Sequence, residues 1–70
     1  MRWSHNEVVR VLRHFGFALH RHGARHDIYA HPDQPRTMVV VPRHRQIPDP
    51  TVRSIWRQAG IARADAEALR

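Results

Sequence analysis

The sequence contains no cysteine, no lysine and no long uninterrupted apolar run. Without cysteine, disulfides and thiolate zinc sites are excluded as sources of stability, so the fold must rest on packing. The apolar runs fall well short of the roughly 18 residues that a membrane-spanning helix needs, and the first residues, Met-Arg-Trp-Ser-His-Asn-Glu, lack the apolar core of a secretion signal. We therefore expect a cytoplasmic protein without a membrane segment.

Because lysine is absent, all twelve cationic side chains are arginine, and the formal net charge is +6 with histidine neutral. Such an excess on 70 residues indicates a polyanionic partner, and phosphate is favoured because the guanidinium fork matches its oxygens. The alternative is a solvated basic surface in a protein from an arginine-rich proteome. A chain of this length holds one small core, so residues 1–70 are expected to form a single domain.

The apolar spacing predicts a helix at residues 4–15, followed by three short strands. The helix begins at a capping-box pattern, Ser4 with Glu7, and Gly16 offers its stop. The strands are expected at residues 17–22, 27–30 and 37–41, and the last of these is the most β-prone run in the chain.

The second half of the chain predicts a loop and then a second helix. Residues 43–48 show little periodicity, whereas Asp49 is suited to cap a helix with Pro50 at its first position and Gly60 at its end. Residues 62–70 are either a short terminal helix or a frayed tail. The expected fold class is therefore α+β: a three-stranded antiparallel sheet with both helices on one face and the other face open.

Seven histidines accompany the arginines, and this combination is suited to cutting RNA without a metal ion. Histidine titrates near neutrality, so it can take the proton from a 2′-hydroxyl group or protonate the leaving oxygen, while arginine stabilises the phosphate charge. His26 is the strongest catalytic candidate because it lies where the turn after Gly23 enters the second strand. The alternative is an ordinary polar surface residue on a basic strand.

Four further residues are candidates for binding RNA: Arg25, Tyr29, Arg43 and His44. Arg43 and His44 follow the third strand and should project from its end towards phosphates. Tyr29 would stack on a base if Ile28 points into the core, because alternation then places Tyr29 on the open face. Its alternative is an ordinary exposed strand aromatic.

Three other side-chain roles follow from position. Asp27 would orient His26 or pair with Arg25, and Gly23 is expected to adopt a positive φ in the turn. A histidine metal site is disfavoured, because pairs such as His26 and His31 have no acidic or cysteine partner at a recognised ligand spacing. No metal or other cofactor is therefore expected.

Together these stretches resemble the HicA-type toxins of bacterial HicA–HicB toxin–antitoxin systems. The resemblance covers residues 4–61 and is carried by the order and spacing of several pieces. They are the opening helix that ends in Phe-Gly-Phe at residues 15–17, His-Asp-Ile-Tyr from residue 26, Val-Pro-Arg-His from residue 41, and Arg-Ser-Ile from residue 53 with Gln-Ala-Gly-Ile from residue 58. Many family members have Gly-Ser-His where this chain has Ala24-Arg25-His26, and Gly23 stands in for the glycine one residue earlier.

The resemblance implies a double-stranded-RNA-binding-like fold and a ribosome-independent mRNA endonuclease. It implies that the catalytic histidine lies at the start of the second strand, which is His26 here. It also implies a HicB-like antitoxin that binds over the active site, in a hetero-oligomer. Two alternatives remain: a noncatalytic RNA-binding module with the same basic sheet surface, and a protein-interaction domain for an acidic partner.

Overall fold

The computed structural model describes residues 2–70, and its first helix, α1 (His5–His14), begins at the predicted capping box. The Glu7 N–H group donates to Ser4 Oγ at 3.1 Å, and the Ser4 N–H group donates to Glu7 Oε1 at 2.8 Å. These bonds satisfy amide groups that a helix start otherwise leaves unpaired. Gly16, with φ of 91°, follows the helix end, as a residue without a Cβ can do.

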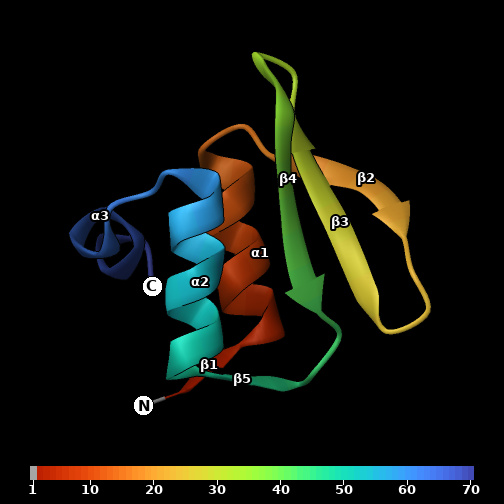
Figure 1. Cartoon of the computed structure of the whole chain (residues 1–70). Helices are drawn as coiled ribbons and strands as arrows, with labels where there is room; N and C mark the ends of the chain where they lie inside the picture. The colour runs from red at the N-terminus through yellow and green to blue at the C-terminus, as the bar shows by residue number, and fades with distance from the viewer. Residues whose placement is uncertain (1) are drawn as a thin grey trace.

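Three strands then form an antiparallel sheet in the order β2-β3-β4 (Figure 1). Their bounds are Ala18–His22, His26–His31 and Gln34–Pro42, respectively. The predicted fold class is thus confirmed, but β4 is longer than expected and leaves Pro32 and Asp33 as the turn. Because β4 is an edge strand, it tolerates Pro35 near its start.

A second, two-stranded sheet pairs β1 (Arg2–Ser4) with β5 (Gln46–Pro48). The prediction of a loop through residues 43–48 is therefore wrong in its second half. Ile47 is fully buried opposite Trp3, so this short pairing is held by side-chain burial. The two strands lie more than 40 residues apart in the chain, and neither is long enough to show a period.

The second long helix, α2 (Asp49–Ala59), starts one residue earlier than predicted, with Pro48 in the N-cap position. Asp49 is inside the helix, and its carboxylate lies 2.8 Å from Arg53 Nε and 3.2 Å from Arg63 Nη2. The prediction that Asp49 caps the helix is therefore wrong. Gly60 ends the helix with φ of 70°, and the residues beyond it form the short helix α3 (Arg63–Ala68).

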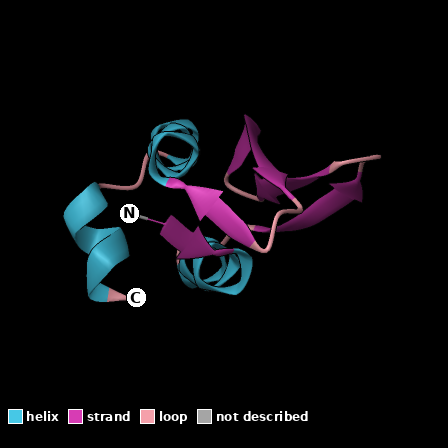
Figure 2. Cartoon of the chain, turned by 90° about the horizontal axis from the view of Figure 1, so that it is seen from below, coloured by secondary structure: helices cyan, strands magenta, loops and turns pink. Residues whose placement is uncertain are grey.

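The helices α1 and α2 lie against one face of the three-stranded sheet, whereas α3 lies beyond α2, away from the sheet (Figure 1 and Figure 2). The core between these layers combines α1, α2 and alternate residues of β3 and β4, together with Trp3, whose ring meets Trp56 edge to face at 5.4 Å. The other sheet face is open and carries the partly exposed side chains of Met38 and Val40. Within residues 2–70, the helices are too short or too polar to cross a bilayer.

Candidate functional site

The turn between β2 and β3 positions His26 through an unusually close backbone approach. The Gly23 N–H group donates to the His26 carbonyl oxygen at 2.7 Å. A Cβ atom on Gly23 would lie 2.6 Å from that oxygen, which is closer than real Cβ atoms come. The expected positive φ is wrong, because the glycines with positive φ are Gly16 and Gly60. Gly23 is needed for space rather than for a left-handed backbone.

Arg43, the first residue after β4, holds this turn by hydrogen bonds. Its Nη2 group donates to the carbonyl oxygens of Gly23 and, at 2.6 Å, of Ala24. Its backbone N–H group donates to the Arg25 carbonyl oxygen at 3.1 Å. Arg43 is predicted to project from the end of the third strand towards phosphates, whereas its guanidinium group folds back onto the turn and donates to carbonyl oxygens there. Its contact with phosphate stays a prediction.

Asp27 supports the same arrangement from the core side of the sheet. Its side chain is only 7% exposed, and its Oδ1 atom lies 2.8 Å from His22 Nδ1 and 3.6 Å from Arg43 Nη1. A buried carboxylate needs such partners to offset its lost hydration. The prediction that Asp27 orients His26 or pairs with Arg25 is wrong, since alternation places Asp27 and His26 on opposite faces of β3.

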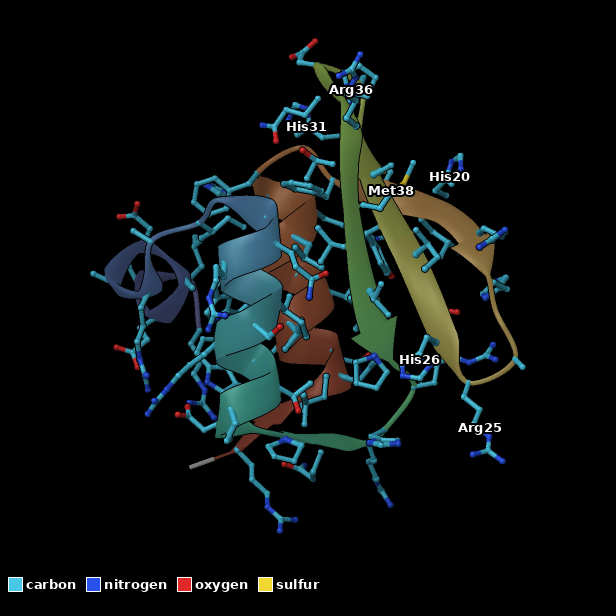
Figure 3. The ribbon with its side chains drawn as sticks, in the orientation of Figure 1. His20, Arg25, His26, His31, Arg36 and Met38 are labelled. Carbon is cyan, nitrogen blue, oxygen red and sulfur yellow. The ribbon has the colours of Figure 1, made fainter. Side chains whose placement is uncertain are left out.

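His26 itself is exposed at the first position of β3, opposite Pro42 at the end of β4 (Figure 3). It lines an open depression of about 320 Å³ at the seam between the sheet and α2. The rest of the lining comes from β4, the segment after it, β5 and α2: Val40, Pro42, His44, Pro48, Thr51 and Gln58.

Gln58 joins α2 to this seam. Its Oε1 atom accepts a hydrogen bond of 3.0 Å from the Val40 N–H group, and its Nε2 group donates to Ser54 Oγ at 3.1 Å. At Val40, a helix side chain thereby satisfies a backbone N–H group on the free edge of β4. No role was predicted for Gln58 or Thr51, because polar residues of a helix show no sequence signal for the strand that they will meet.

A second open depression, of about 360 Å³, lies beside the first and is basic. Its lining is His5, Arg43, His44 and Arg45, so His44 belongs to both depressions. The His5 N–H group donates to the Arg45 carbonyl oxygen at 3.1 Å, which ties the start of α1 to the segment between β4 and β5. The structure thus brings His26 and His44 to one surface flanked by arginine.

Residues 6–61 match the family model described as the HicA toxin of bacterial toxin–antitoxin systems, which is most of the chain. The chain belongs to the HicA toxin family. No curated protein matches this HicA chain in a sequence search. The matched span contains the turn, both depressions and α2.

In this HicA chain the structure also contradicts the predicted placement of Tyr29. Tyr29 is 4% exposed and lies in the core, on the same face of β3 as Asp27. The prediction for Tyr29 depended on Ile28 pointing into the core. Instead, Asp27 and Tyr29 point into the core, and Ile28 lies on the other face of β3. Tyr29 is therefore not available to stack on a base.

Arg25 lies at the tip of the turn and extends into solvent (Figure 3). His31, at the other end of β3, has a local structural contact: its Nδ1 atom accepts from the Asp33 N–H group at 3.0 Å. Across residues 2–70, histidine, aspartate and glutamate side chains do not gather in groups of three that are suited to hold a metal ion.

Proposed function

We propose that this HicA-family toxin is an endoribonuclease, an mRNA interferase that cuts messenger RNA independently of ribosomes and without a metal ion. His26 is the general base that removes the proton from the 2′-hydroxyl group beside the scissile phosphate. The 2′-oxygen then attacks phosphorus, and the bond to the 5′-oxygen breaks. The products are a 2′,3′-cyclic phosphate and a free 5′-hydroxyl group.

The observation that carries this proposal is the position of His26. An exposed imidazole stands at the edge of an open depression, on a turn held by Gly23 and by three hydrogen bonds from Arg43. Such a turn keeps a catalytic group in place before substrate arrives, and this lowers the entropic part of the barrier.

Arginine and histidine around the depression supply phosphate contacts. We assign this role to Arg25, which precedes His26 in the turn, and to Arg43, which follows β4. His44 lies beside them in both depressions, where it would meet the bound RNA. The Arg43 side chain remains 39% exposed, so it can face a phosphate while holding the turn. A HicB-like antitoxin would silence the toxin by covering this basic surface in a hetero-oligomer.

The test is cleavage of an unstructured RNA by purified protein, without ribosomes and with excess EDTA. We expect cyclic-phosphate ends, and no cut where deoxyribose replaces ribose at the cleavage site. His26→Ala should abolish cleavage while leaving the melting temperature unchanged, since the side chain is exposed. His20→Ala is the matched control, because His20 is an exposed histidine on β2 (Figure 3).

Three outcomes would count against the proposal. RNA binding without cleavage by the wild-type protein would favour the noncatalytic RNA-binding module. Loss of cleavage in EDTA that a divalent metal restores would overturn the metal-free mechanism. Full activity of His26→Ala would remove His26 from the chemistry.

A further inference from the structure

Two histidines from different parts of the chain line the same depression. His26 opens β3, whereas His44 lies in the segment after β4. The antiparallel register pairs His26 with Pro42, which brings the beginning of one strand beside the end of the other. Because of this pairing, His44, which follows Pro42 by two residues, lines the same depression as His26.

Cleavage through the 2′-hydroxyl group needs two proton transfers. A base must remove the 2′-hydroxyl proton, and an acid must protonate the 5′-oxygen as its bond to phosphorus breaks. The proposed role of His26 accounts for the first transfer alone. A 5′-alkoxide that leaves without a proton is a poor leaving group, so a site with one histidine would catalyse half of the reaction.

We propose that His44 is the general acid of this reaction, an inference that rests on the proposed endoribonuclease function. His26 accepts the 2′-hydroxyl proton while the 2′-oxygen forms its bond to phosphorus. His44 donates its proton to the 5′-oxygen as the phosphorus–oxygen bond breaks. His26 leaves the step protonated and His44 neutral, and proton exchange with water restores both.

The surroundings of His44 suit this role. On one side it shares the basic depression with His5 of α1 and with its chain neighbours Arg43 and Arg45. On the other side it lines the same depression as His26, to which α2 contributes the uncharged Thr51 and Gln58. The arginines can hold the phosphate next to the imidazole and stabilise the charge that builds on its oxygens.

A simpler role for His44, phosphate binding alone, makes a different prediction for the leaving group. A general acid becomes dispensable when the leaving group needs no proton, whereas a phosphate-binding residue stays necessary. The discriminating substrate is RNA with sulfur in place of the bridging 5′-oxygen at the cleavage site mapped for the wild-type protein, because a thiolate leaves without protonation.

On ordinary RNA, His44→Ala should lower kcat by about 10²- to 10⁴-fold, the usual contribution of acid–base catalysis. On the 5′-thio RNA, His44→Ala should cleave at close to the wild-type rate, whereas His26→Ala should stay inactive on both. Arg45→Ala is the matched control from the same segment, and it should weaken cleavage of both substrates equally. His44→Gln, which keeps a polar side chain, should behave as His44→Ala.

The pH profile supplies a second measurement. An acid works while protonated, so wild-type kcat/KM should fall at high pH, and His44→Ala should lose that fall while keeping the rise that reports His26. Equal impairment of His44→Ala on both substrates would overturn the general-acid role. Failure of wild-type protein to cut either RNA would instead overturn the proposed function itself, so the two failures are distinguishable.

Discussion

Gly23 illustrates how one residue without a side chain can set the position of a nearby histidine, here His26, the general base that we propose. We predict that Gly23→Ala reduces RNA cleavage far more than it reduces stability, because the new Cβ would lie 2.6 Å from the His26 carbonyl oxygen and the turn must open. Cleavage rates and thermal melts measured together check this.

Gly60→Ala is the matched control for that substitution. Gly60 has φ of 70° and no neighbour within 4 Å of an added Cβ, so alanine there is strained only through its backbone. It should cost about 1 kcal/mol of stability and leave cleavage unchanged. If Gly23→Ala cleaves as well as Gly60→Ala, the close approach at the turn is unimportant for activity.

Arg43 holds the turn, and we propose that it also contacts phosphate; substitutions can separate the two roles. Arg43→Lys keeps the positive charge but loses the fork that reaches the carbonyl oxygens of Gly23 and Ala24. We predict that it lowers cleavage while preserving the salt dependence of RNA binding. Arg43→Ala should lower both, and the slope of log affinity against log salt should decrease by about one.

Nuclease assays and RNA-binding titrations at several salt concentrations make this comparison. If Arg43→Lys cleaves RNA at the wild-type rate, the hydrogen bonds from Arg43 to the turn are dispensable for cleavage. A salt slope that stays unchanged in Arg43→Ala would show that Arg43 contacts no phosphate.

At the scale of elements, the Glu7 carboxylate stabilises the start of α1 by binding both the Ser4 backbone and the Arg70 side chain. The pKa of Glu7 lies below its ordinary value of 4.5, first because the Ser4 backbone N–H group donates to it and then because Arg70 does, with Nε 3.1 Å from Oε2. Arg70 also stacks over the Trp3 ring at 4.3 Å. Glu7 therefore ties the first helix to the far end of the chain.

This arrangement predicts how stability depends on pH. A carboxylate whose pKa is lower in the folded state stabilises the protein above its unfolded pKa, and the contribution disappears as pH falls through the folded pKa. Glu7→Ala should therefore cost about 1 kcal/mol at neutral pH, as a lost cap does, and the difference from wild type should vanish in acid.

Denaturant unfolding at a series of pH values measures this difference. Glu67→Ala is the control: its carboxylate pairs with Arg63 at 3.5 Å on the exposed surface of α3, and its loss should cost less than about 0.5 kcal/mol. A deficit for Glu7→Ala that persists unchanged below pH 4 would show that the carboxylate charge is not what stabilises the helix start.

At the scale of the whole molecule, the two depressions lie where elements from distant parts of the chain meet. The first joins β3, β4, β5 and α2, and the second joins α1 to the segment between β4 and β5. The small β1–β5 sheet brings that segment beside the start of α1. A pairing of three residues in each strand thus helps to build the surface to which we assign catalysis.

Local chemistry in the sequence was sufficient to predict the order of the two long helices and of the three strands of the main sheet, and to place His26 at the start of the second of these strands, but it did not predict β1 or β5. The capping box of Ser4 and Glu7, the stops at Gly16 and Gly60 and the β-prone run of residues 37–41 each depend on neighbours within a few positions. Such short-range signals survive in the sequence because local backbone preferences decide them.

Only the tertiary structure decided which face of β3 is buried and what Arg43 binds. Asp27 lies inside, where His22 of β2 and Arg43, the residue after β4, pair with it, and Tyr29 on the same face of β3 lies in the core. The same strand pairing brings His44 to the depression of His26. These contacts join residues far apart in the chain. The alternation of side chains along a strand defines two faces, but it does not show which face will be buried against other elements.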